Sequence, residues 1–278
     1  MRFEACLFAM ALGFVGCGEN LTVPPDRDPA ADPDPAPLTC LPNLDGQIDR
    51  AELVPAIGTP ISYVVSPPGT SRAVDIVGTE GEDGAEWDFS TDYSDDQALS
   101  VTPTTLEGKW YAGSFDDGAF ITPFNRSGSL ESIGRLTDGG LLLLGIASKD
   151  ESPEEGQTLL VYEPPITVLK FPVQVGQSFV SFGEITSGVA LGLPYAGRDT
   201  YEVLVDAAGS VDLIQFTFDE VLRVRTKVTV EPAVGAPVVK QQASFYAECF
   251  AEVARATSAD GETDPDFTDA AELRRLGY

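Results

Sequence analysis

The chain has 278 residues, with 44 Asp and Glu against 17 Lys and Arg, so its formal net charge is −27. It contains no His, which excludes Ser-His-Asp and Cys-His catalysis and His-ligated metal sites. The negative charge argues against nucleic acid as a partner, because phosphates would be repelled from this surface. With 43% hydrophobic residues, the chain is able to bury a sizeable core.

Residues 1–16 have the organisation of a signal peptide. Arg2 supplies a short positive region, and residues 5–15 form an uninterrupted apolar run. The run is shorter than the roughly 20 residues that a helix needs to cross a bilayer, so we expect a cleaved signal rather than a transmembrane helix. The alternative is a buried N-terminal helix with an incidental cysteine.

The residues before Cys17 resemble the lipobox of bacterial lipoproteins. The motif reads Phe14-Val15-Gly16-Cys17, with Phe14 where Leu is usual. The resemblance implies cleavage before Cys17, attachment of fatty acids such as palmitate to its thiol, and acylation of the new amine. It also implies a place in the envelope of a Gram-negative bacterium. Gly18 stands where an aspartate would retain such a protein in the inner membrane, which favours the outer membrane.

Residues 17–39 form the expected tether between the lipid and the folded body. They are rich in proline, and residues 19–37 hold five acidic residues against one basic residue. Proline removes backbone donors and the acids repel one another, so we expect an extended segment that reaches about 50–60 Å. The membrane is then a partner through the covalent lipid alone, because an anionic body gains nothing from anionic headgroups.

The remaining cysteines fit an exported protein. Cys6 leaves with the signal peptide and Cys17 carries lipid, which leaves Cys40 and Cys249. Two cysteines in an oxidising compartment predict a disulfide between the end of the tether and the C-terminal part of the body. The alternative is a pair of free thiols with Cys249 buried.

The body, from residue 40 onward, has an all-β pattern. Short runs rich in Val, Ile, Phe and Tyr alternate with clusters of Gly, Pro, Asp and Ser, which is typical of strands and turns. The clearest hairpin joins residues 129–137 to residues 141–147 through Asp138-Gly139-Gly140. Residues 141–144 are all leucine, which predicts a strand that is covered on both faces. The other expected strands are 61–66, 73–77, 109–115, 120–124, 159–162, 167–171, 177–182, 222–230 and 245–253.

The domain organisation follows from these segments. We expect a first β segment over residues 40–165 and a second over residues 166–278, arranged as an antiparallel β-sandwich or as two β lobes. Residues 267–278 are expected to form either a short helix or a closing strand. The runs 171–173, 175–179 and 221–224 resemble β-rich domains of uncharacterised secreted bacterial lipoproteins, which implies an exported all-β domain with no known activity.

Three basic residues alternate along the strand expected at residues 222–230. Arg223, Arg225 and Lys227 share one face of this strand. Antiparallel pairing with residues 245–253 would bring them opposite Glu248 and Glu252, and such pairs contribute about 0.2–1 kcal/mol each. We therefore expect structural ion pairs. The alternative is an anion-binding site.

Residues 41–52 resemble the calcium-binding loop of EF-hands and dockerins. Asn43, Asp45, Asp49 and Glu52 stand at ligand positions of such a loop, and Gly46 stands at the position of its sharp turn. Leu41 occupies the first ligand position, where the loop requires an oxygen. The alternative is a turn followed by one helical turn capped by Asp49. Calcium is the only cofactor that the sequence suggests.

No motif in the sequence assigns a reaction. Nucleophile elbows, Walker A loops and dinucleotide fingerprints are absent from it. Residues 80–96 are rich in acids and suggest a calcium site, and Trp87, Trp110 and Tyr111 suggest a platform for stacking a sugar. We favour an exposed acidic loop around a strand whose Trp87 and Phe89 enter the core. The leading hypothesis is a non-enzymatic binding, adhesive or structural module of the envelope, with an envelope protein or a glycan as partner. The alternatives are a carboxylate-dependent glycan hydrolase and a calcium-stabilised surface adhesion domain.

Overall fold

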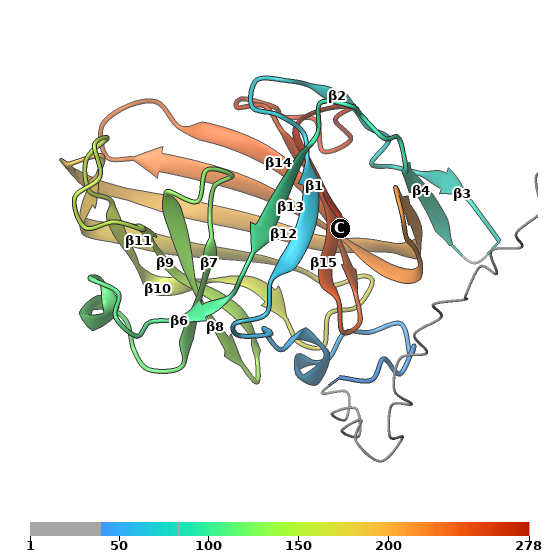
Figure 1. The fold of residues 1–278 in the computed structure, drawn as a ribbon, viewed down its shortest axis with the longest axis horizontal. Coiled ribbons are helices and arrows are strands. Elements are labelled where there is room, and N and C mark those ends of the chain that lie inside the picture. The colour runs from blue at the N-terminus through green and yellow to red at the C-terminus, as the bar shows by residue number, and fades with distance from the viewer. Residues whose placement is uncertain (1–39, 83, 278) are drawn as a thin grey trace, which may run out of the picture. The chain divides into compact units, whose positions relative to one another are not determined.

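The part of the chain that the computed structural model describes, residues 40–82 and 84–277, consists mainly of β-strands (Figure 1). The all-β fold class expected from the sequence is confirmed. The expected signal peptide, Cys17 and the tether lie outside the described residues. The described elements are η1 (Arg50–Leu53), β1 (Ile61–Val65), β2 (Arg72–Ala73), β3 (Thr79–Glu80), β4 (Ala85–Phe89), β5 (Gln97–Val101), β6 (Thr104–Thr105), η2 (Ala112–Ser114), β7 (Ala119–Pro123), β8 (Leu130–Thr137), β9 (Gly140–Ser148), β10 (Leu159–Lys170), β11 (Ser178–Ala190), β12 (Leu193–Leu213), β13 (Thr217–Pro232), β14 (Val238–Ala247), β15 (Ala251–Ser258) and β16 (Asp269–Leu276).

All sixteen of these strands belong to one sheet. Its main order is β5-β1-β16-β15-β14-β13-β12-β11-β10-β9-β8-β7-β6, with β2, β3 and β4 attached to its side. Neighbouring strands are antiparallel, except that β4 pairs in parallel with β12. The boundary expected at residues 165/166 falls inside β10, so the two expected β segments contribute to the same sheet.

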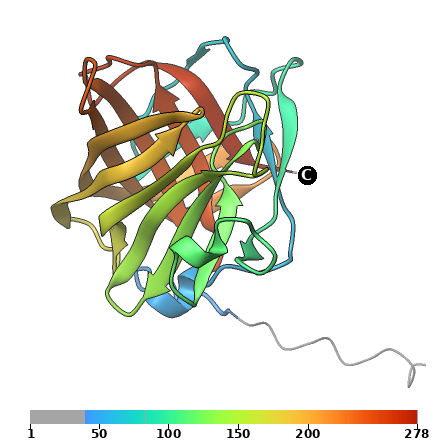
Figure 2. The same cartoon turned by 90° about the vertical axis from the view of Figure 1, so that its left-hand side faces the viewer.

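The two edges of the sheet are held close together by the chain itself. β5 and β6 stand at opposite ends of the strand order, yet only Thr102 and Pro103 separate them in sequence. The three peptide steps from Val101 to Thr104 cover at most about 11 Å. A sheet whose edges are tied this closely has to curl, and the two views show the curl (Figures 1 and 2).

The curl gives the sheet an inner face with its own apolar cluster. Its members come from eight consecutive strands, β8 to β15, and from residues that precede β1. The bend itself is shown by a contact across the sheet, because Arg126 between β7 and β8 lies 3.4 Å from Glu272 of β16. The buried members of the cluster are Ile48, Leu53, Leu169, Val173, Val203, Val205, Leu222 and Val224.

The outer face of β12 to β16 carries a second cluster. Residues 74–89 lie over it, and Trp87 and Phe89 of β4 contact Phe245 of β14 with ring centroids 4.9 and 5.2 Å apart. Trp87 and Phe89 are therefore core residues, as the sequence predicts. At Gly209 of β12 the backbone of β4 approaches so closely that a Cβ would lie 1.8 Å from the Ala85 oxygen, so a side chain has no room there.

The β8–β9 hairpin confirms the clearest sequence prediction. Thr137 pairs with Gly140, which leaves Asp138 and Gly139 as the two-residue turn. The leucines of β9 are covered on both faces: Leu144 packs in a cluster with Tyr111, and Leu143 packs in another with residues of β10 and β11.

The structure corrects four of the expected elements. Of the strand expected at residues 73–77, only Ala73 lies in a strand, β2. Residues 109–115 contain the short helix η2 rather than a strand. The tail forms the strand β16, so the expected helix is wrong and the alternative of a closing strand is right. The run 245–253 is interrupted after Ala247, because Cys249 and Ala251 have φ angles of 65° and 59°, and a chain in this left-handed region turns instead of extending.

We predict that Phe245→Ala lowers the free energy of unfolding by about 3–5 kcal/mol, because a fully buried aromatic ring leaves a cavity between the rings of Trp87 and Phe89. Phe250 is the matched control, since its side chain is 51% exposed in the β14–β15 turn. Phe250→Ala should cost less than about 1 kcal/mol. Urea unfolding of both variants measures the difference. Equal losses would contradict the assignment of Phe245 to the core.

Candidate functional site

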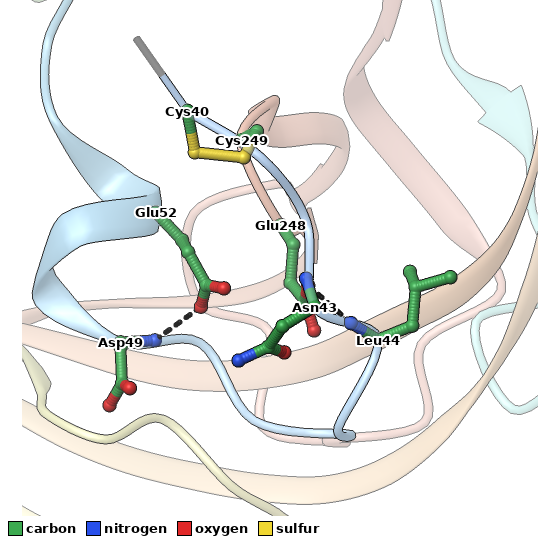
Figure 3. The surroundings of a disulfide bond; sticks show 7 residues. All are labelled: Cys40, Asn43, Leu44, Asp49, Glu52, Glu248 and Cys249. Carbon is green, nitrogen blue, oxygen red and sulfur yellow. Dashed lines mark hydrogen bonds between the residues drawn. A yellow bond between two sulfur atoms is a disulfide. The ribbon is translucent and has the colours of Figure 1, made fainter. Parts of the chain in front are cut away.

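A disulfide between Cys40 and Cys249, which we call the joint, fixes the beginning of the described chain to the body of the protein. Cys40 is the first described residue, and it forms a disulfide with Cys249 in the turn between β14 and β15 (Figure 3). The two cysteines are 209 positions apart in sequence. We refer to residues 40–54, which follow the disulfide, as the N-terminal strap.

Hydrogen bonds and apolar contacts hold the N-terminal strap along its length. Glu248, which is buried, accepts hydrogen bonds from the backbone N–H groups of Asn43 and Leu44 at 2.7 and 2.8 Å (Figure 3). Ile48 exchanges two backbone hydrogen bonds with Val173. Its side chain and that of Leu53 are buried in the inner cluster. The strap therefore covers apolar surface inside the curl of the sheet.

Three of the four residues of the calcium hypothesis accept a backbone N–H of the strap with a side-chain oxygen, and the fourth, Asp49, supplies one of these N–H groups. Asn43 Oδ1 accepts a hydrogen bond from the Asp45 N–H, and Asp45 Oδ1 accepts one from the Gln47 N–H. Glu52 Oε2 accepts the Asp49 N–H at 2.8 Å, where η1 begins (Figure 3). No group of three or more Cys, Asp or Glu side chains in residues 40–82 and 84–277 is arranged to hold a metal ion.

Glu52 is an unfavourably placed carboxylate within the strap. Burial raises its pKa, and the charges of Glu248, Asp49 and Asp45 raise it further, although the hydrogen bond from Asp49 acts in the opposite direction. The ionised form of Glu52 is therefore less favourable in the folded protein than in the unfolded chain. Its charge reduces stability at neutral pH.

The three basic residues of β13 form ion pairs, but not with the predicted partners. Arg223 and Arg225 both contact Asp206 of β12 at 2.8 Å, and Arg225 also contacts Asp266. Lys227 pairs with Glu202 of β12 at 2.6 Å. The prediction that Glu248 and Glu252 are the partners is wrong. Glu248 instead binds the N-terminal strap, and Glu252 accepts a hydrogen bond from the Ser244 hydroxyl on the inner face.

The reason for this correction lies in the register of the strands. Opposite Arg223 and Arg225, β14 places Phe245 and Ala243, which carry no charge. On the other side of β13, a β-bulge in β12 leaves Asp206 as an extra residue between Val205 and Ala207. A bulge redirects a side chain, and here it brings one carboxylate within reach of both arginines.

A second group of charges lies on the inner face. Three arginines surround the carboxylate of Glu272 on β16, namely Arg126 of the β7–β8 turn, Arg255 of β15 and Arg274 of β16. Arg255 also lies 3.6 Å from Glu252. We call Arg126, Arg255, Arg274, Glu252 and Glu272 the arginine cluster.

Strand register places this cluster on the inner face of the sheet. Ser244 is paired with Val224, an inner-face residue, and also with Arg255, which in turn is paired with Arg274. Burial raises the pKa of Glu272, but the charges of Arg255, Arg274 and Arg126 outweigh burial and hold it below its usual range.

Another buried carboxyl group lies on the inner face, at Asp199 of β12. Burial raises its pKa, although the hydroxyl of Tyr162 donates a hydrogen bond to its Oδ2 at 2.6 Å. Its Oδ1 is buried without a hydrogen-bond partner among the described residues. The surroundings of Asp199 include Tyr195 and Tyr201, whose pKa values are raised first by burial and then by the Asp199 charge.

Sequence reasoning did not identify the arginine cluster. Its only local signal is the alternation Ala254-Arg255-Ala256, which predicts that Arg255 points away from the core on the other face. Arg126 stands in a turn 146 positions before Glu272, and no sequence pattern links them. The joint at Cys40 and Cys249, by contrast, is where the sequence places it.

Comparisons with family models, curated proteins and solved structures find no match for this chain. Within residues 40–82 and 84–277, no helix combines the length and apolar character needed to cross a membrane.

We predict that Arg225 is energetically coupled to Asp206 and not to Glu248. In a double-mutant cycle, Arg225→Gln and Asp206→Asn should show a coupling energy of about 0.5–3 kcal/mol, because they share a partly buried ion pair. Arg225→Gln and Glu248→Gln should be additive within about 0.5 kcal/mol. Urea unfolding of the single and double variants measures both cycles. A larger coupling with Glu248 than with Asp206 would contradict the observed register.

We predict that Glu52→Gln stabilises the protein at neutral pH, because it removes a buried charge while keeping an oxygen for the Asp49 N–H. A carboxyl group with a raised pKa costs stability above that pKa, and the cost disappears as the pH falls through it. The gain in melting temperature over wild type should therefore be larger at pH 7 than at pH 4. Glu155→Gln, on an exposed loop, is the control. A gain that is the same at both pH values would disprove the role of charge.

Proposed function

We propose that this chain is a lipid-anchored envelope protein whose β-sheet body acts as a non-enzymatic binding, adhesive or structural module. The observation that carries the proposal is the joint at Cys40. This residue follows Cys17 by only 40 − 17 = 23 positions, and it is bonded covalently to the body. Such a joint suits a protein that is held by its N-terminus.

The disulfide supports an exported location. Disulfides persist in the periplasm and at the cell surface, whereas cytosolic thiols are kept reduced. With Cys40 and Cys249 paired, removal of residues 1–16 would leave Cys17 as the remaining cysteine of the chain. This is the residue that the lipobox resemblance assigns to lipid. The outer membrane of a Gram-negative bacterium remains the favoured location, with an envelope protein or a glycan as partner.

We rank the two alternatives below this function because their residues have other partners. A glycan hydrolase needs two carboxyl groups that face each other across the substrate, one of them desolvated. Asp199 is a desolvated carboxyl group, but it accepts a hydrogen bond from Tyr162 and is surrounded by other tyrosines. A calcium-stabilised adhesion domain would use the N-terminal strap, where Asn43, Asp45 and Glu52 accept backbone hydrogen bonds.

The lipid anchor is tested by expressing the full chain in a Gram-negative host beside its Cys17→Ala variant. We expect the wild type to begin at Cys17, to carry the mass of a diacylglyceryl group and an amide-linked acyl chain, and to sediment with membranes. The Cys17→Ala protein should keep residues 1–16 or be released without lipid. Intact mass and cell fractionation provide the measurement.

A variant with Cys40→Ser and Cys249→Ser is the matched control, because it removes two cysteines of the body and keeps Cys17. It should be lipidated like the wild type. A wild type that retains its first sixteen residues and carries no lipid would overturn the proposal.

A further inference from the structure

The arginine cluster contains more positive charge than its carboxylates balance. Three guanidinium groups face the carboxylates of Glu252 and Glu272, so the charge of the five side chains is +3 − 2 = +1. This surplus occurs in a chain whose net charge is −27. Burying unbalanced charge is costly, so the surplus calls for a physical reason.

The ion pairs of the cluster are long, and all three arginines share one carboxylate. The three arginines contact Glu272 at 3.4, 3.4 and 3.3 Å. Elsewhere in the body Arg72 reaches Asp96 at 2.7 Å, which is a normal length for a charge-assisted hydrogen bond. Arg255 and Arg274 are direct cross-strand partners, and like charges in this position repel each other. One carboxylate is thus shared by guanidinium groups that crowd one another.

Hydrogen-bond donors are in surplus as well. Arg126 has two buried nitrogen atoms, Nε and Nη1, with no partner among the described residues, and no other arginine of residues 40–82 and 84–277 has an unpartnered buried Nη atom. Arg255 and Arg274 each have an unpartnered Nε, as do four arginines outside the cluster. The Arg274 side chain is only 9% exposed, and burial together with the charge of Arg255 lowers its pKa. An unpartnered buried donor costs stability unless an acceptor reaches it.

The cluster is nevertheless partly exposed to solvent. The side chains of Glu272 and Arg255 are 23% and 20% exposed, so the ion pairs are not sealed by the surrounding strands. A small molecule that approaches Glu272 therefore meets the guanidinium groups of the cluster.

We propose that the arginine cluster is a binding site for the oxyanion group, phosphate or carboxylate, of a small molecule. The guanidinium fork matches both groups in shape and charge. Arg126, Arg255 and Arg274 supply the donors, and one negative charge neutralises the surplus. Glu272 holds the arginines in place and competes with the ligand for them. The site is independent of the lipid anchor.

A purely structural role for the cluster makes different predictions. Arg126 comes from the β7–β8 turn and Glu272 from β16, so their ion pair also ties distant parts of the curled sheet together. If the Arg126–Glu272 ion pair had only this structural role, replacing either residue would lower the stability of the protein by the same amount in the presence and in the absence of phosphate. If the cluster binds an oxyanion, removing Glu272 frees its three arginines for the ligand.

The experiment compares the purified full chain in sodium phosphate and in sodium chloride of equal ionic strength at pH 7. Phosphate should bind saturably in calorimetry and raise the melting temperature. Glu272→Gln should bind phosphate about tenfold more tightly than wild type, because the competing charge is gone. Arg126→Gln should bind it about tenfold more weakly, because a charge-assisted hydrogen bond is lost.

Arg198→Gln is the matched control, because Arg198 is exposed and pairs with Glu184 away from the cluster. It should bind phosphate like the wild type. Sodium glucuronate is tested in the same way. Saturable binding of glucuronate alone would show that the site takes a carboxylate, and saturable binding of phosphate alone would show that it takes a phosphate group. Should Glu272→Gln fail to fold, Arg126→Gln decides the question. Equal effects of all the anions at matched ionic strength would overturn the proposal.

Discussion

The short link between β5 and β6 is the constraint on which the rest of the structure depends. Thr102 and Pro103 join strands from opposite edges of the sheet, so the sheet curls until those edges approach each other. The curl creates an inner face, and the N-terminal strap fills part of it with Ile48 and Leu53. It also brings Arg126, in the turn between β7 and β8, to Glu272 of β16, although β7 and β8 are far from β16 in the order of the sheet.

Charge is distributed unevenly over this architecture. Every arginine in residues 40–82 and 84–277 takes part in an ion pair, and several of these pairs are buried, such as that of Arg275 with Asp96. The arginines are thus committed to holding strands and loops together. The carboxylates outnumber them, and the exposed surface is left acidic. The arginine cluster departs from this distribution because its local balance is positive.

The sequence predicts features that depend on neighbouring residues and misses those that depend on register. The β8–β9 hairpin and the alternation along β13 follow from local patterns, because a two-residue turn and a period of two fix them. The partners of Arg223 and Arg225 do not, because a bulge at Asp206 decides them. The break at Cys249 was hidden by an alternation that continues through the turn. The arginine cluster forms only because the sheet curls, and no local sequence pattern predicts this curl.

The disulfide at the N-terminal strap also determines how a mechanical load would travel. A pull along the chain from its N-terminus reaches Cys40 and passes through two sulfur atoms to Cys249, in the turn between β14 and β15. Residues 41–248 are bypassed by this route, so the strap is not peeled off the inner face and the strands before β15 are not drawn out one after another. Tension enters the sheet between the fourth and fifth of the thirteen strands in its main order.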